Sequence, residues 1–155
     1  MGKTICFVNN KGGCGKTTTV CAVGQAWAEL GKKILFVDLD SQSNLTCIIT
    51  DTDPSTKEWE QTLEDAFVGG PDYGLPIEHV SENIDIIPSD LDLSNFERET
   101  ARYTGREFLL ADLLETVKEN YDYILIDCPP ALSLITYNTL VASDHMVMVT
   151  NAEGL

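Results

Sequence analysis

The chain has 155 residues, 43% of them hydrophobic, which is enough for one domain with a buried core. Its apolar runs are all shorter than the roughly 18 residues of a membrane span, and Gly2-Lys3 leads into a strand rather than a secretory signal, so we expect a cytoplasmic protein. Ten basic against 25 acidic residues give a net charge of −15, which argues against nucleic-acid binding by this stretch unaided.

The first predicted elements are a strand and a helix. Residues 4–8 form a continuous apolar run, which predicts a parallel strand buried on both faces. A helix is predicted over residues 17–30, where apolar side chains recur at helical spacing on the expected core side: Val20, Val23, Trp27 and Leu30. Between them, residues 9–18 read Asn-Asn-Lys-Gly-Gly-Cys-Gly-Lys-Thr-Thr. A strand, a glycine-rich turn and a helix in this order are typical of a phosphate-binding loop.

Two side chains of this loop indicate its chemistry. We expect Lys16 to reach the β- and γ-phosphates of a nucleotide, and the Thr17 hydroxyl to bind Mg²⁺. A glycine-rich turn that binds nothing is the alternative. The two lysines, the three glycines and the flanking strand and helix together favour the phosphate loop.

A second buried strand is predicted over residues 34–37, and it runs into Asp-Leu-Asp-Ser-Gln-Ser-Asn at residues 38–44. Carboxylates just beyond the C-terminal end of a strand lie where an open α/β sheet binds ligands. An acidic turn that caps the next helix is the other interpretation. The neighbouring phosphate loop favours the ligand-binding one.

The middle of the chain predicts one strand, at residues 84–87, and helices at residues 44–50, 62–68, 91–100 and 107–119. Pro88 ends the strand, and the last of these helices has a leucine-rich face. His79 and His145 are single histidines, which favours structural roles for both.

Residues 121–130 read Tyr-Asp-Tyr-Ile-Leu-Ile-Asp-Cys-Pro-Pro, a buried strand that ends in Asp127. This is the Walker B arrangement, in which the carboxylate holds the magnesium shell, and an aspartate that only caps a helix is the alternative. A further strand is predicted over residues 145–149. The five cysteines show no C-x-x-C spacing, so no disulfide framework is expected.

Three motifs carry a resemblance to a known family. The phosphate loop has Asn10 where the general pattern has glycine, and with Lys11 it resembles the deviant Walker A motif, which has a second lysine near its start. Residues 38–44 resemble the D-x-D-P-Q-G-N segment, with Ser41 for proline and Ser43 for glycine. Residues 121–130 are similar to the Y-D-x-I-(I/L)-I-D-x-P-P run. From residue 3 to residue 155 the chain resembles the N-terminal part of a ParA/Soj-type partition ATPase of the ParA/MinD superfamily.

The resemblance implies a three-layer α/β/α sandwich with a mostly parallel sheet. Residues 1–155 would form a single P-loop ATPase domain that lacks the C-terminal strands and helices of the family. ATP or ADP would be bound by Lys11, Gly12, Gly13, Cys14, Gly15, Lys16, Thr17 and Thr18. Mg²⁺ would be held by Thr17, Asp40 and Asp127. The catalytic groups would be Lys16, Asp40, which positions the attacking water, and Lys11, which reaches the partner subunit's phosphates across a two-fold axis.

The implied function is an ATP-driven switch for plasmid or chromosome partitioning. It would work as a homodimer formed across the nucleotide, with a ParB-like adaptor protein that stimulates hydrolysis, and would bind no membrane. Non-specific DNA would be bound by the full-length, nucleoid-associated form and not by this chain alone. The alternatives are a MinD-like division-site ATPase, which needs a C-terminal amphipathic helix not found here, an ATP-dependent iron–sulfur electron donor, and a truncated fragment that binds nucleotide weakly without turnover.

Overall fold

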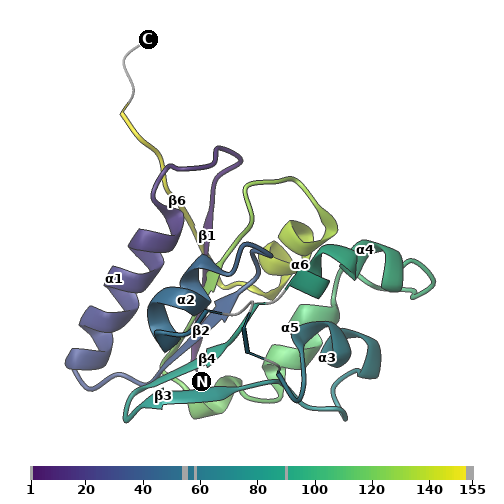
Figure 1. The fold of residues 1–155 in the computed structure, drawn as a ribbon, viewed down its shortest axis with the longest axis horizontal. Helices are drawn as coiled ribbons and strands as arrows, with labels where there is room; N and C mark the ends of the chain where they lie inside the picture. The colour runs from purple at the N-terminus through teal and green to yellow at the C-terminus, as the bar shows by residue number, and fades with distance from the viewer. Residues whose placement is uncertain (1, 54–55, 58, 90, 153–155) are drawn as a thin grey trace.

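The computed structural model describes residues 2–53, 56–57, 59–89 and 91–152. Within these residues one mixed, mostly parallel sheet has the strand order β3-β4-β2-β5-β1-β6 (Figure 1). Only the pairing of β3 with β4 is antiparallel. The strands are β1 (Lys3–Val8), β2 (Ile34–Asp38), β3 (Glu78–Ser81), β4 (Ile84–Ile87), β5 (Tyr123–Asp127) and β6 (His145–Met148).

Helices cover both faces of the sheet, which confirms the predicted three-layer α/β/α architecture. The helices are α1 (Lys16–Glu29), α2 (Asn44–Thr50), α3 (Leu63–Gly69), α4 (Phe96–Glu99), α5 (Leu109–Glu115) and α6 (Leu134–Ala142). Two 3₁₀ turns, η1 (Leu91–Asn95) and η2 (Lys118–Asn120), precede α4 and β5.

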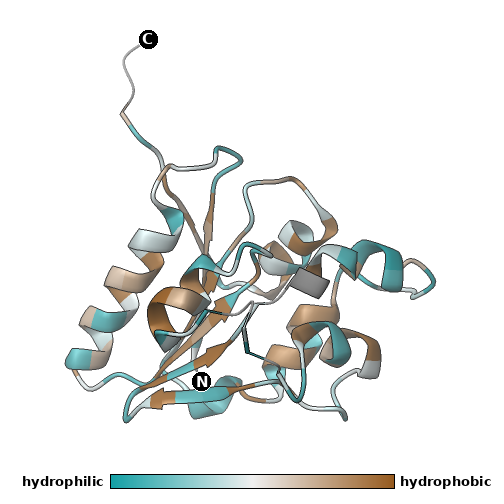
Figure 2. Ribbon diagram, in the orientation of Figure 1, coloured by the Kyte–Doolittle hydropathy of each residue, from teal (hydrophilic) through white to brown (hydrophobic). Residues whose placement is uncertain are grey.

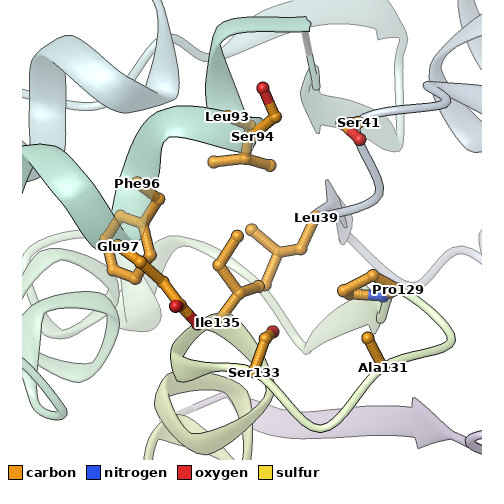
Figure 3. Close-up of a pocket in the computed structure, with 10 residues that line it drawn as sticks. All are labelled: Leu39, Ser41, Leu93, Ser94, Phe96, Glu97, Pro129, Ala131, Ser133 and Ile135. Atoms are coloured by element: carbon orange, nitrogen blue, oxygen red, sulfur yellow. The ribbon is translucent and has the colours of Figure 1, made fainter.

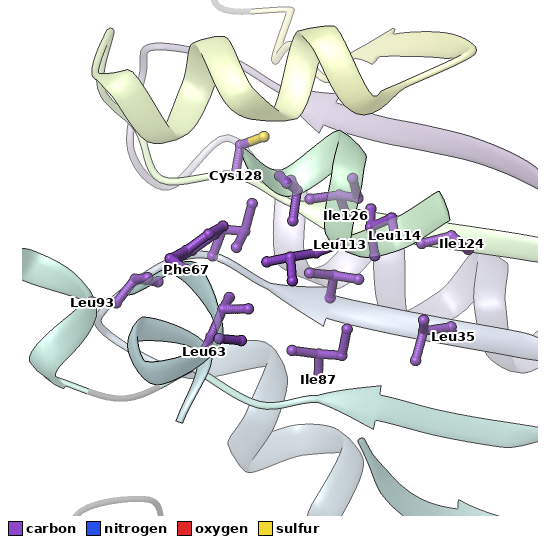
Figure 4. Packing of buried hydrophobic residues seen from close by; sticks show 14 of the residues in the cluster. Leu35, Leu63, Phe67, Ile87, Leu93, Leu113, Leu114, Ile124, Ile126 and Cys128 are labelled. Carbon is purple, nitrogen blue, oxygen red and sulfur yellow. The ribbon is translucent and has the colours of Figure 1, made fainter. Parts of the chain in front are cut away.

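Alternation along the strands divides the core into two halves. Side chains such as Phe36 and Leu125 point to the face covered by α1 and α2. Their neighbours Leu35 and Ile124 point to the opposite face, where they pack with leucines of α3 and α5 (Figure 4). Both faces of the central strands are therefore apolar, as their continuous hydrophobic runs predict. Figure 2 shows much of these strands in brown, the colour of hydrophobic residues.

The register of the sheet brings three chain segments to one edge. Asp38 at the end of β2 lies opposite Asp127 at the end of β5, and Phe7 near the end of β1 lies opposite Asp127 on the other side. Because these strands are parallel, the loops that follow them leave the sheet side by side. The glycine-rich loop, the turn at residues 39–43 (the Asp40 turn) and the segment after Asp127 are therefore neighbours.

Several predicted elements differ from the observed ones. The antiparallel strand β3 was not predicted, because its residues are polar or exposed and show no apolar alternation. Residues 91–100 form a 3₁₀ turn and a single helical turn, and the helix predicted over 107–119 is shorter, with a separate 3₁₀ turn after it. Leu30 was predicted in the core and is 77% exposed, because it lies beyond the last turn of α1 as its C-cap.

The edge strand β6 is exposed along its whole length. Met146 and Met148 are 53% and 67% exposed, and Tyr137 and Val141 of the adjacent α6 are also exposed. These side chains place an apolar surface beside the edge strand. Among the residues the structure describes, none of the helices is long and apolar enough to cross a membrane.

Candidate functional site

The loop between β1 and α1 presents unused backbone N–H groups at a helix N-terminus. Gly13 and Gly15 have φ values of 70° and 91°, a left-handed conformation that favours glycine. The first backbone hydrogen bond of α1 runs from Thr19 N to Gly15 O at 2.9 Å, so the N–H groups of the first turn are not used within the helix. No acidic side chain occupies that turn, which leaves the positive end of the helix dipole available to an anion.

The side chains of the loop are arranged from its inside to its outside. Lys16 is 7% exposed, and its Nζ lies 3.4 Å from Lys11 O, so its ammonium group is held within the loop. The side chain of Cys14 is buried, so only its backbone is available to a phosphate. Lys11 is exposed, and its N–H donates to Asn9 Oδ1 at 2.8 Å. The Asn9 amide donates in turn to Val149 O at 2.6 Å, which ties the start of the loop to the end of β6.

One cavity of about 390 Å³ gathers most of the predicted site residues. Its lining comprises Gly12, Gly13, Gly15, Lys16, Thr17, Thr18, Asp40, Gln42, Asn44 and Pro130. Asp127 lies behind Thr17, whose hydroxyl donates to Asp127 Oδ2 at 2.5 Å. The structure therefore brings the loop, Asp40 and Asp127 together, and leaves Lys11 and Cys14 outside the lining. Gln42, Asn44 and Pro130 also line the cavity and were not predicted as site residues, although each lies within a motif that was recognised.

The Asp40 turn is a tight loop closed by its own backbone. Asp40 O accepts from Ser43 N at 2.8 Å, and Asp40 Oδ1 accepts from Gln42 N at 3.0 Å. Ser43 is buried and has φ 55°, a left-handed conformation at the position where the family segment has glycine. The turn therefore keeps the backbone shape that glycine would allow without strain.

Two buried carboxyl groups lie side by side beneath the cavity. Burial raises the pKa of Asp38 to about 7, with a smaller rise from the nearby Asp127, although hydrogen bonds from Thr46 lower it. Burial also raises the pKa of Asp127 to about 6, and the Thr17 hydrogen bond opposes this rise. The sequence predicted a role for Asp127 and assigned none to Asp38. The signal that could have found Asp38 is its place as the last residue of a strand that is buried along its whole length, whereas Asp40 lies beyond the strand.

The oxygens around Thr17 suit a magnesium ion that accompanies nucleotide phosphates. Asp127 Oδ1 is buried and has no hydrogen-bond partner among the described residues. Mg²⁺ is commonly held by one or two carboxylates together with water and phosphate oxygens, so a carboxylate beside a threonine hydroxyl fits this ion. Within the described part of the chain, no group of three or more His, Cys, Asp or Glu side chains is placed to hold a metal ion by itself.

A second cavity of about 230 Å³ lies on another side of the Asp40 turn (Figure 3). Leu39 and Ser41, the two neighbours of Asp40, contribute to its lining together with Pro129 and residues of α4 and α6. Glu97 at this cavity accepts a hydrogen bond from Leu134 N at 2.8 Å, which links α4 to the start of α6. The segment around Asp40 therefore runs between two cavities.

Comparisons with known proteins agree with this geometry. Residues 2–155 match the sequence profile of a family described as an AAA domain (AAA_31). The chain is 42% identical over 154 residues to the sporulation initiation inhibitor protein Soj of Bacillus subtilis, and 34% identical over 154 residues to the chromosome partitioning protein ParA of Caulobacter vibrioides. It covers 60% and 57% of the lengths of these relatives, and they cover 99% and 97% of this chain.

A solved structure is also similar across the described fold. The cobyrinic acid a,c-diamide synthase of Mycobacterium smegmatis, solved with bound ADP and magnesium, has a TM-score of 0.86 and 31% sequence identity. The match covers 96% of this chain and 60% of that one. The chain thus spans about 60% of the length of the proteins to which it is similar.

Proposed function

The chain belongs to the ParA/Soj family of partition ATPases within the AAA_31 domains, and from this membership we propose that it is an ATP-dependent switch for plasmid or chromosome partitioning, which hydrolyses ATP to ADP and phosphate. The observation that carries the proposal is the single cavity in which the glycine-rich loop, Lys16 and Thr17 face Asp40. Of the similar proteins, the two partition relatives are the more similar in sequence, at 42% and 34% identity against 31% for the synthase.

We assign the roles of the residues from their positions. The N–H groups of the loop and of the first turn of α1 bind phosphate oxygens, and Lys16 neutralises their charge. Thr17 and Asp127, with Asp40 as the third predicted ligand, would hold Mg²⁺, and this ion when bound would neutralise charge on the phosphates. Asp40, which lines the same cavity, orients the attacking water. Hydrolysis of this kind depends mainly on positioning and charge stabilisation.

The position of Lys11 favours a homodimer formed across the nucleotide. Its side chain is exposed at the start of the loop and does not line the cavity of its own chain. A lysine at this position, outside the cavity of its own chain, would reach the phosphates of a second copy in such a dimer. Lys11→Ala should therefore keep nucleotide affinity within about threefold and reduce ATP-dependent dimerisation, measured by light scattering with ATP and Mg²⁺. Lys32→Ala, at an exposed position after α1, is the control, and equal dimer fractions for all three proteins would remove the trans role.

The proposed cycle also involves non-specific DNA and an adaptor protein, in the cytoplasm at the nucleoid. Ten basic residues against 25 acidic ones give this chain a net charge of −15, and Lys11 and Lys16 are assigned to nucleotide. Residues 1–155 should therefore bind duplex DNA poorly. An anisotropy titration at low salt with ATP and Mg²⁺ tests this, and saturable micromolar binding would contradict it. A ParB-like protein is the proposed partner that stimulates hydrolysis.

The decisive experiment measures nucleotide binding. The chain should bind ATP or ADP in the presence of Mg²⁺ by calorimetry, and Lys16→Gln should lose at least about 100-fold in affinity, because the phosphates lose their nearest cation. Lys32→Gln serves as the matched control, since it removes a lysine from an exposed position outside the cavity lining. Unchanged affinity in Lys16→Gln would refute the assignment of this cavity to nucleotide.

A further inference from the structure

Asp38 is the centre of a buried hydrogen-bond cluster beneath the Asp40 turn. Its Oδ2 accepts from Thr46 N at 2.8 Å and from Thr46 Oγ1 at 2.7 Å, and its Oδ1 accepts from Asp40 N at 3.1 Å. Asp38 and Thr46 are both 0% exposed. One carboxylate therefore joins the end of β2 to the Asp40 turn and to the first turn of α2.

Thr46 extends the cluster to the neighbouring strand. Its hydroxyl, which donates to Asp38, also accepts from Ser89 N at 3.0 Å. Ser89 follows the end of β4 and is also 0% exposed. The ends of β2 and β4 and the start of α2 are thus connected through one hydroxyl group.

Strand pairing also connects Asp38 to Asp127 at the end of β5. Asp38 is paired in register with Asp127, and Leu39 N donates to Asp127 O at 3.0 Å. Asp127 in turn accepts from the Thr17 hydroxyl. The position of Asp40, which donates to Asp38, is therefore fixed relative to β5 and to the phosphate loop.

Leu39 is 1% exposed and packs in the core, but packing supports the rest of the Asp40 turn less, because the turn lies between two cavities. One cavity is lined by Asp40 and Gln42, and the other by Leu39 and Ser41. Ser43, at the start of α2, makes no side-chain cap to this helix, and Asp38 accepts from the helix N–H group of Thr46 in its place. Hydrogen bonds to Asp38 therefore tie the turn to β2 and to α2, in addition to the hydrogen bonds that the turn makes within itself.

We propose that Asp38 and Thr46 are positioning residues for the proposed hydrolysis, which hold Asp40 at the distance from the phosphate loop that the reaction requires. The inference rests on the proposed function for its consequence in turnover. Neither side chain lines the nucleotide cavity, so both act through Asp40 and not by contact with the nucleotide. A displacement of about 1 Å in a reacting group can reduce a rate on the order of 100-fold.

Thr46→Val is the most informative variant, because it keeps the side-chain volume and removes only the hydroxyl group. Thr46→Ser restores the hydroxyl. Thr100→Val is the matched control, since Thr100 is also 0% exposed and its hydroxyl donates to Phe96 O at 2.6 Å, within its own helix. A purely structural role predicts similar behaviour for the two valine variants.

The first measurement is amide hydrogen exchange in the nucleotide-free protein, followed by NMR. Exchange at Asp40, Ser43 and Thr46 should accelerate about tenfold or more in Thr46→Val, while exchange in β5 stays unchanged. Thr46→Ser should remain within about threefold of the parent, and Thr100→Val should not accelerate exchange at these three amides. Unchanged exchange at Asp40 and Ser43 in Thr46→Val would overturn the proposal, whether or not the chain hydrolyses ATP.

The second measurement is steady-state ATP hydrolysis, with Mg²⁺, beside calorimetric ADP affinity. Thr46→Val should lose at least about tenfold in kcat with ADP affinity within about threefold, and Thr46→Ser should recover the parental kcat. Equal losses in Thr46→Val and Thr100→Val, or a loss of affinity in parallel with kcat, would overturn the positioning role. Failure of the parent protein to bind nucleotide would instead refute the proposed function, and the exchange experiment would still decide the support of the turn.

Discussion

The Thr17 hydroxyl donates a hydrogen bond of 2.5 Å to Asp127 Oδ2, although the two residues are 110 positions apart in the sequence. The bond joins the first turn of α1 to the end of β5, and it places together two of the three groups assigned to Mg²⁺. The other oxygen of Asp127 is buried without a partner among the described residues. An oxygen of this kind is expected to gain a ligand when the site is filled.

Thr17→Ala should therefore reduce the contribution of Mg²⁺ to nucleotide binding. In the parent, ADP affinity should rise when Mg²⁺ is added and fall again with EDTA. In the variant, the rise in ADP affinity on adding Mg²⁺ should be at least about tenfold smaller than in the parent, because the variant lacks a ligand and leaves Asp127 with one fewer hydrogen bond. Thr17→Ser keeps the hydroxyl and should behave like the parent. An unchanged magnesium effect in Thr17→Ala, measured by calorimetry, would contradict the assignment.

Asp40→Ala should separate binding from turnover. A group that orients the attacking water contributes typically on the order of 10² to 10⁴ in rate, so hydrolysis should fall by at least about 100-fold. Nucleotide affinity should stay within about threefold, because the loop and Lys16 are unchanged. Asp112→Ala, at an exposed position on α5, is the control for loss of a carboxylate. Hydrolysis at the parental rate would mean that Asp40 only stabilises its own turn.

Ser43→Gly should stabilise the protein. Ser43 adopts φ 55°, and a left-handed conformation costs a non-glycine residue on the order of 1 kcal/mol, partly offset by the greater freedom of glycine in the unfolded chain. We expect a rise of roughly 1 to 3 °C in melting temperature by calorimetry. Ser133→Gly should act in the opposite direction, since Ser133 has φ −127° and its side chain caps α6. A lower melting temperature for Ser43→Gly would show that the serine side chain contributes more to stability than its left-handed backbone conformation costs.

The pH dependence of stability should reflect the two buried carboxyl groups. The pKa of Asp38 is raised to about 7 and that of Asp127 to about 6, both chiefly by burial. A carboxyl group whose folded pKa is raised stabilises the fold below its unfolded pKa, and this contribution is lost as the pH rises through the folded pKa. The melting temperature of the nucleotide-free protein should therefore fall between pH 5 and pH 8.

Asp38→Asn isolates one of these groups. Repulsion among the acidic residues also grows with pH, so the parent alone cannot assign the slope. The variant removes the titration of Asp38 and should show a shallower fall in melting temperature over the same range, at fixed ionic strength. A slope identical to that of the parent would show that Asp38 keeps one ionisation state throughout.

Local patterns predicted the parts of the site that each lie in one segment. The glycine-rich loop, Asp40 and Asp127 each follow an apolar strand, and the structure places all three at one edge of the sheet. What the patterns could not provide is the contact between segments. The bond from Ser89 N to the Thr46 hydroxyl and the link from Asn9 to Val149 depend on the strand order, which no single stretch of sequence contains.

The errors in the fold have a similar cause. Leu30 continues the helical spacing of α1, but the helix ends before it, and Gly24 packs against the Phe36 ring so closely that a Cβ atom would lie 2.2 Å from it. The face of α1 that packs on the sheet therefore includes Gly24 and excludes Leu30, so the spacing of the large apolar residues predicted this face only in part. Strand β3 is held by its pairing with β4, and its own side chains are mostly exposed.

The position of β1 between β5 and β6 has a consequence for how the chain folds. Lys3 is paired with Tyr123 and Ile5 with His145, so the strand that leads into the phosphate loop has both of its partners at the far end of the sequence. Ribosomes add about 5 to 20 residues per second, so β1 waits on the order of ten seconds for β5 to be made. Such distant pairings are also slow to form because of the entropy lost in closing a long loop. The proposed nucleotide binding should therefore require synthesis and folding through β5, and a nascent chain that stops earlier carries the loop sequence without the site.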